Sequence, residues 1–196
     1  MPQDVTFYFD FVSPYSYLAF TQLPALVERT NAAFTFKPVH ILTIMDKVGN
    51  VPTTATCKSK GLYARTDLAR WAMQYKTMIK PHPKFGTFST EPLLLGALAA
   101  EGRGQLAAYT KAAFEAIWLN EGDVESGDAI VAWLTTAGVV DAEEIWKNRD
   151  DFKAQLEENH QSAISDGVFG VPSFKTSTGL YFGNDRLHFL EAELVA

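Results

Sequence analysis

The sequence predicts an α/β fold in which a large, continuous helical block interrupts a small mixed sheet. Three observations lead to this prediction. Segments rich in β-branched and aromatic residues, typical of strands, occur near the two ends of the 196-residue chain. Between these ends, apolar residues recur at helical spacing. The two N-terminal strand segments are separated by one helical segment, which is typical of a parallel pair with a crossover helix.

The N-terminal segment is expected to form a strand, a helix and a second strand. Val5–Phe11 has the composition of a buried strand with an acid inside it. Ser13 followed by Pro14 is typical of a helix start, because a hydroxyl caps the helix and proline occupies a position whose N–H is not needed. The helix is expected to reach Glu28, and Phe34–Val39 is expected to form the second strand.

The middle of the chain is expected to be helical. Proline- and glycine-rich breaks divide it at Pro81–Pro83, at Glu101–Gly104 and at Gly122-Asp123. The expected helices are Lys58–Lys76, Pro92–Glu101, Gln105–Asn120, Asp128–Ala137 and Lys153–Ser165.

Strand signals return near the C-terminus. Ser173–Thr176 and Leu180–Phe182 flank a turn at Thr178-Gly179, and Asp185–Leu194 closes the chain as a helix. The order is therefore β-α-β, a helical block, then β-β-α, which is the thioredoxin arrangement short of one strand. We expect a thioredoxin-like fold with a large all-helical insertion.

The insertion is expected to be continuous in sequence. The thioredoxin-like domain would comprise residues 1–40 and 167–196, and residues 41–166 would form the helical subdomain.

Composition excludes several classes of partner. The net charge is −6 and no stripe of Lys and Arg is present, so we expect no nucleic-acid binding. The longest apolar stretch, Pro92–Ala100, is too short to cross a membrane, and we expect no membrane partner. The N-terminal MPQDVTFYFDF lacks the basic and apolar regions of a secretory signal, which favours a cytoplasmic protein.

Cys57 is the one cysteine of the chain. An intramolecular disulfide and an internal redox dithiol are therefore impossible, and any sulfur chemistry needs a thiol from another molecule. The histidines lack the spacing that places two imidazoles on one helix face, so we expect no metal site. They are His40, His82, His160 and His188.

The first candidate motif is DFVSPYSYL, residues 10–18, where the first strand meets the first helix. In thioredoxin-like folds this turn holds the nucleophile of a C-x-x-C pair, and here the spacing gives Ser13-x-x-Ser16. A serine hydroxyl does not ionise near neutral pH without a strong base. It can donate a hydrogen bond to a sulfur anion from another molecule, beside the N–H groups of the helix start. The alternative is that Ser13 only caps the helix.

The second motif is GVFGVPSF, residues 167–174. Pro172 follows a β-branched residue and precedes a strand, where a cis peptide bond is expected. An extended peptide could then pair with the N–H and C=O of Val171. The alternative is a trans proline that opens an edge strand.

The third motif is YFGNDRL, residues 181–187, at the start of the last helix. Exposed N–H groups there favour a carboxylate, and the neighbouring acid Asp185 could contact an ammonium. This combination suits the zwitterionic end of an α-amino acid. The alternative is that Asn184 or Asp185 only caps the helix.

Together, the segments DFVSPYSYLA, YARTDLARWA, VFGVPSF and FGNDRL resemble the 2-hydroxychromene-2-carboxylate isomerase family, which is related to kappa-class glutathione transferases and DsbA-type thioredoxin folds. The resemblance implies a homodimer, glutathione as cofactor, and an isomerisation in the breakdown of naphthalene-type aromatic compounds. In that family the glutathione thiolate adds to a chromene carboxylate, the ring opens, a bond rotates, and elimination releases the trans product.

The resemblance also implies roles for individual residues. Ser13 would be the catalytic residue that contacts and activates the glutathione sulfur. Val171 and Pro172 would hold the cysteinyl backbone, and Asn184 and Asp185 would hold the γ-glutamyl end. A kappa-like transferase or peroxidase is the alternative enzyme. A binding protein that keeps the proline groove without catalysis is the alternative outside enzymes.

The expected pocket for an aromatic substrate departs from the family pattern. Lys47 is displaced relative to the Gly-Asn pair that follows it, and Thr54-Ala55 stands where the family has Asn-Arg. The candidate anion contacts are Lys47, Asn50, Lys58 and Lys60, each of which could instead be a solvated surface residue. Phe85 could form a wall of the pocket or anchor its loop in the core.

One further helix carries polar residues whose role is open. Asp67 and Arg70, three residues apart on the expected Lys58–Lys76 helix, could pair with each other.

Overall fold

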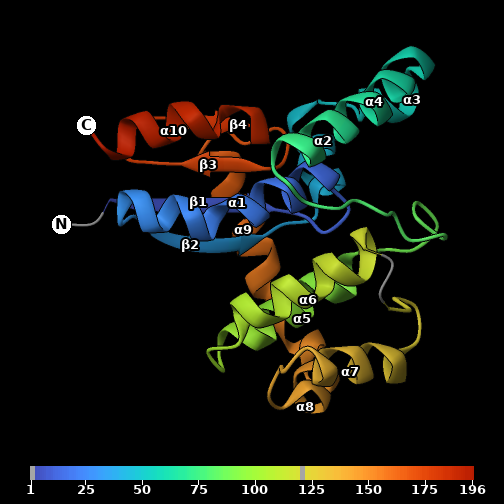
Figure 1. The fold of residues 1–196 in the computed structure, drawn as a ribbon. Helices are drawn as coiled ribbons and strands as arrows, with labels where there is room; N and C mark the ends of the chain where they lie inside the picture. The colour runs from blue at the N-terminus through green and yellow to red at the C-terminus, as the bar shows by residue number, and fades with distance from the viewer. Residues whose placement is uncertain (1–2, 120–121) are drawn as a thin grey trace. The chain divides into compact units, whose positions relative to one another are not determined.

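A computed structural model describes residues 3–119 and 122–196 (Figure 1). The predicted end of one helix at Asn120 and the first two residues of the N-terminal segment lie outside the described residues. The chain divides into two compact units, Met1–Met78 with His160–Ala196 and Ile79–Asn159. These boundaries differ from the expected insertion of residues 41–166, because 41–78 and 160–166 group with the sheet.

The different boundary has a cause in the core of the first unit. One cluster of buried side chains joins the strands, the segment after residue 40 and the end of a helix near residue 163. Its members are Tyr8, Val39, Ile41, Ile44, Ala163, Val168 and Val171. The apolar side chains that follow the second strand therefore pack on the sheet.

The first unit contains a four-stranded mixed sheet. Strands β1 and β2 are parallel, whereas β1 with β3 and β3 with β4 are antiparallel, in the order β2-β1-β3-β4 (Figure 1). The strands are β1 Asp4–Phe9, β2 Ala33–Pro38, β3 Ser173–Lys175 and β4 Leu180–Phe182. The predicted parallel pair and C-terminal hairpin are confirmed.

The helices of the first unit include the crossover helix and the last helix, which contact each other. Their bounds are α1 Pro14–Thr30, α2 Ile41–Val48, α3 Thr53–Thr56, α4 Lys58–Gln74, the 3₁₀ helix η2 Asn184–Arg186 and α10 Leu187–Leu194. Asn31 caps the end of α1, and its backbone N–H, in a residue with left-handed backbone (φ 54°), donates to the Val27 carbonyl. Helices α2 and α3 were not expected, because each is too short for a clear periodic signal.

The second unit is helical. It contains α5 Glu91–Glu101, α6 Leu106–Trp118, α7 Gly127–Thr136, α8 Ala142–Lys147, η1 Arg149–Phe152 and the first part of α9 Lys153–Ser165. Helix α5 is buried on every side from Leu93 to Ala100. Gly96 permits this packing, because a Cβ there would collide with the Tyr109 hydroxyl. Within the described ranges, no helix is both long and apolar enough to cross a membrane.

Packed aromatic rings, some stacked and one edge-on, hold the sheet of the first unit together. The ring of Phe7, fully buried in β1, lies 5.2 Å from Phe9, 5.5 Å from Phe36 and 5.0 Å from Phe174. Because Phe36 belongs to β2 and Phe174 to β3, one side chain contacts three strands. Such pairs add to the free energy gained by burying the ring area.

We expect Phe7→Ala to lower the free energy of unfolding by about 3–5 kcal/mol, because it removes a fully buried ring that packs against three other rings. Urea denaturation followed by circular dichroism measures this. Phe189→Ala is the control, since Phe189 is 53% exposed and its loss should cost under about 0.5 kcal/mol. Equal losses for the two variants would contradict the assigned core.

Candidate functional site

The turn between β1 and α1 places Ser13 at the N-cap of the helix. Ser13 has an extended backbone (φ −90°, ψ 114°), and its Oγ accepts a hydrogen bond from the N–H of Ser16 at 3.1 Å. Pro14 follows as the first helical residue, as predicted. Ser13 is therefore a helix cap, and any chemistry of its hydroxyl comes in addition to that structural role.

Asp10 connects this turn to α2. Its side chain is fully buried, Oδ1 accepts from the N–H of Val12 at 3.0 Å, and Oδ2 accepts from the N–H of Ile41 at 2.9 Å. The sequence placed this acid inside a strand, but β1 ends at Phe9. A buried carboxylate is tolerated where it is hydrogen-bonded, and here it fixes the start of α1 against the start of α2.

The second motif lies against the first. The Val171–Pro172 peptide bond is cis, as the sequence predicted. The Ser13 hydroxyl donates a hydrogen bond to the Val171 carbonyl at 3.2 Å. Two segments separated by 158 residues in sequence therefore meet at one side chain.

The third motif is joined to the second through the backbone. The N–H of Gly183 donates to the Pro172 carbonyl at 2.9 Å. Gly183 has φ 99°, and a Cβ at this position would collide with the Asp185 carboxylate. The structure thus brings Ser13 and Asn184 into one connected site.

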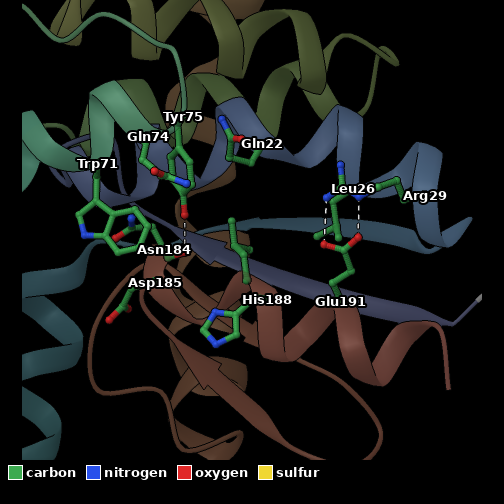
Figure 2. A pocket seen from close by; sticks show the side chains of 11 residues that line it. Gln22, Leu26, Arg29, Trp71, Gln74, Tyr75, Asn184, Asp185, His188 and Glu191 are labelled. Carbon is green, nitrogen blue, oxygen red and sulfur yellow. Dashed lines mark hydrogen bonds and ion pairs between the residues drawn. The ribbon is translucent and has the colours of Figure 1, made fainter.

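A cavity of about 320 Å³ lies beside the third motif. Figure 2 shows Trp71, Gln74 and Tyr75 at the end of α4 facing the start of the last helix across this cavity. The Tyr75 hydroxyl donates to the Asn184 carbonyl at 2.7 Å. Burial raises the pKa of Tyr75, so its hydroxyl stays a donor at neutral pH.

The cavity has polar and charged walls. Asp185, His188 and Glu191 line it from the C-terminal segment, and Gln22, Leu26 and Arg29 line it from α1. Arg29 and Glu191 form a two-pronged ion pair, with N–O distances of 2.5 and 2.9 Å (Figure 2). This pair joins α1 to α10 at one wall.

Two buried polar atoms in these segments have no hydrogen-bond partner within the part of the chain that the structure describes. They are the hydroxyl of Ser16, which is fully buried, and Nδ2 of Asn184, whose residue is 2% exposed. Unsatisfied buried polar atoms are costly and are often completed by a ligand or water. Asn184 lines the cavity, so an acceptor held there could satisfy its amide.

Further residues near the site lie along one face of α4, and of these the sequence indicated Asp67, as a possible partner of Arg70. Tyr63, Asp67, Trp71 and Tyr75 are spaced four residues apart, which places them on the same side of a helix. The Tyr15 hydroxyl, two residues after Ser13, donates to Asp67 at 3.1 Å. The four-residue repeat of aromatic and acidic residues was the available signal in the sequence.

Burial and the charge of Asp67 both raise the pKa of Tyr15. The phenol is therefore neutral at physiological pH and acts as a hydrogen-bond donor. Asp67 accepts this hydrogen bond from Tyr15, whereas the Arg70 guanidinium lies 6.0 Å from the centre of the Tyr63 ring.

Among the residues expected to contact substrate, Lys47, Asn50 and Phe85 are not brought together. Lys47 is exposed in the last turn of α2. The amide of Asn50 donates to the Phe169 carbonyl at 2.8 Å, which ties it to the loop before Pro172. Phe85 belongs to the second unit, where its ring lies 4.8 Å from that of Trp118.

Cys57 is exposed and forms no disulfide. Among the residues for which coordinates are described, no group of three or more His, Cys, Asp or Glu side chains is arranged to hold a metal ion.

Comparison with known proteins agrees with this architecture. A model of the DSBA-like thioredoxin domain matches residues 4–195. The 2-hydroxychromene-2-carboxylate isomerase of Sphingobium xenophagum is 30% identical over 198 residues, and the match covers 100% of both chains. The chain belongs to the 2-hydroxychromene-2-carboxylate isomerase family.

Further matches define the neighbours of this isomerase-family chain. A solved 2-hydroxychromene-2-carboxylate isomerase superposes with a TM-score of 0.85 at 27% identity, covering 97% of this chain and 94% of that one. The human glutathione S-transferase kappa 1 is 28% identical over 97% of this chain and 90% of its own. The relatives support an isomerase function.

A Ser13→Cys substitution tests the electrostatics at the head of α1. In a Cys57→Ser background, we expect the new thiol to have a pKa below about 7.5, because the helix N-terminus stabilises a thiolate. Ultraviolet thiolate absorbance against pH measures it. A value near the ordinary 8.5 would show that the helix start gives no such stabilisation.

Proposed function

We propose that this chain is a glutathione-dependent isomerase that acts on aromatic carboxylates of the 2-hydroxychromene-2-carboxylate type. The observation that carries the proposal is the hydrogen bond from the Ser13 hydroxyl to the Val171 carbonyl at 3.2 Å. It joins a hydrogen-bond donor at a helix start to the backbone before the cis proline, where an extended peptide could pair. The relatives named as isomerases and glutathione transferases support the same assignment.

The residues present suit a thiol-containing tripeptide. When bound, glutathione would supply the nucleophilic sulfur that this chain lacks near Ser13. Asn184 Nδ2, buried and without a partner in the described chain, suits the γ-glutamyl carboxylate. The Asp185 carboxylate suits the γ-glutamyl ammonium, although it already contacts Arg186. The donor and acceptor types therefore match the two ends of the ligand.

Ser13 would change its hydrogen-bond partner when the ligand binds. A hydroxyl has a single hydrogen, and that of Ser13 is donated to the Val171 carbonyl. Donation to a sulfur anion requires this bond to open, which leaves the Val171 carbonyl free to accept from a peptide N–H. One ligand that offers both an anion and an N–H would thus replace one internal bond with two.

Ser13 would then stabilise negative charge, together with the N–H groups of the first turn of α1. Charge-assisted hydrogen bonds of this kind are stronger than those between neutral groups. Neutral Tyr15 could add a donor only by releasing Asp67. Addition to and elimination from an activated double bond need such a stabilised anion and an oriented acceptor, without a redox dithiol.

A kappa-like glutathione transferase is the second candidate. The kappa transferases among the relatives favour it, as does Thr54-Ala55 at the position where the isomerase family has Asn-Arg. Conversion of 2-hydroxychromene-2-carboxylate with and without glutathione distinguishes the two. Conjugation of chlorodinitrobenzene without isomerase turnover would favour the transferase, and failure to bind glutathione would favour a non-catalytic binding protein.

The homodimer and the cytoplasmic location stay predictions.

We expect Ser13→Ala to lower kcat roughly 100-fold, because it removes a donor to a developing anion. The dissociation constant for glutathione, measured by calorimetry, should change less than about threefold. The loss of the cap alone should cost about 1 kcal/mol of stability. Ser126→Ala is the matched control, since Ser126 caps α7 in the second unit through Ala129. Unchanged turnover in Ser13→Ala would refute the role.

The role of Asp185 can be tested with an altered ligand. We expect Asp185→Asn to weaken glutathione binding about tenfold, because the amide cannot pair with an ammonium. Binding of N-glutaryl-cysteinylglycine, which lacks the amino group, should be the same for both proteins. Calorimetry with both ligands and both proteins gives the four dissociation constants of this thermodynamic cycle. An equal loss for both ligands would show that Asp185 acts on the fold and not on the ammonium.

A further inference from the structure

A second pocket lies on the same helix face as the cavity of Figure 2, nearer to the start of α4. It measures about 400 Å³ and is lined by Tyr15, Thr54, Ser59, Lys60, Tyr63 and Ala64. All six residues belong to the first unit. Of the residues expected to contact substrate, Lys60 is among these six, whereas Lys47, Asn50 and Phe85 are not.

The pocket adjoins the proposed sulfur site through Tyr15. This residue is two positions after Ser13 in the first turn of α1, and its hydroxyl is held by Asp67 at 3.1 Å. The bond fixes the ring of Tyr15 between α1 and α4. A molecule against this ring would therefore lie next to the helix start at which the proposed nucleophile is activated.

The opposite wall is also ordered by specific contacts. Gly61 allows α3 to approach α4 closely, because a Cβ there would lie 2.7 Å from the Thr54 carbonyl oxygen. The Arg70 guanidinium lies 6.0 Å from the Tyr63 ring centre, within the range of a cation–π contact. Yet Tyr63 remains 62% exposed, so most of its surface is open to a ligand.

The chemistry of the lining is selective. Two aromatic rings offer faces for a planar apolar molecule. Of the six lining residues one, Lys60, is charged, and it is positive. Thr54 and Ser59 add hydroxyls, which can donate hydrogen bonds. None of the six carries a carboxylate that would repel an anion.

We propose that Lys60, Tyr63 and Tyr15 determine substrate specificity, and that this pocket holds a planar aromatic carboxylate. Lys60 pairs with the acid group, while Tyr15 and Tyr63 contact the ring. Asp67 is a positioning residue that acts through Tyr15. This inference rests on the proposed function for its link to catalysis, but the binding it describes needs no glutathione.

The test uses 1-naphthoate and its neutral counterpart 1-naphthamide, added to the full chain without glutathione and followed by calorimetry. We expect the carboxylate to bind about fivefold more tightly than the amide, the size expected of a solvent-accessible ion pair. Lys60→Gln should abolish this difference, and Lys60→Arg should restore it. Added salt should reduce it as well.

Two further variants separate the pocket from general effects. Arg65→Gln removes one exposed positive charge from the same helix outside the lining, and it should leave the fivefold difference intact. Tyr63→Leu should weaken both probes about fivefold, because it removes a ring face and no charge. Equal effects of Lys60→Gln and Arg65→Gln would overturn the proposal, because the preference for the carboxylate would then come from the summed positive charge of α4 and not from a contact with Lys60.

The outcome is independent of the proposed function. Selective binding of 1-naphthoate that depends on Lys60, with no glutathione binding, would keep the pocket and reject the glutathione-dependent enzyme. Glutathione binding with no difference between the two probes would do the reverse.

Discussion

The hydroxyl of Ser13 has one hydrogen and can donate one hydrogen bond at a time, and the geometry of the site depends on where that bond goes. It is donated to the Val171 carbonyl, while the oxygen accepts from the first turn of α1. One side chain thus caps a helix and joins two segments that are distant in sequence. Because a hydroxyl cannot donate twice, any anion bound by Ser13 competes with Val171, and ligand binding is coupled to a change in the protein's own hydrogen bonds.

The backbone around this hydroxyl is fixed by buried groups. The carboxylate of Asp10 holds the turn before α1 against the start of α2, and Gly183 bonds to the carbonyl of Pro172. The sheet below is held by the stacked rings around Phe7. Positions that bind or activate a ligand need such support, because a loosely held donor loses much of its electrostatic effect.

Residues of helix α4 line two separate spaces in the first unit. Tyr63 borders a pocket near the start of α1, and Trp71 and Tyr75 border a cavity near the last helix. The two spaces differ in character: Lys60 is the charged residue of the first, whereas Asp185, Glu191 and Arg29 line the second. A positive aromatic pocket and a mixed polar cavity suit two different ligands, or two ends of one reacting pair.

The sequence by itself determined the fold class, the absence of an internal dithiol and the three motifs, of which two begin helices and one precedes a strand. These depend on local chemistry: Ser13-Pro14 begins a helix, Val171-Pro172 precedes a strand, and one cysteine cannot form an intramolecular pair. The parallel pair and the long helices followed from periodicity, which is clear over many residues.

Only the tertiary structure decided which side chains meet. The sequence could not show that α2 packs on the sheet, that Asn50 binds the Phe169 carbonyl or that Phe85 packs against Trp118. Nor could it show that Tyr15 bonds to Asp67 across 52 residues. Such contacts depend on how separate elements dock, and a short-range pattern carries no information on docking.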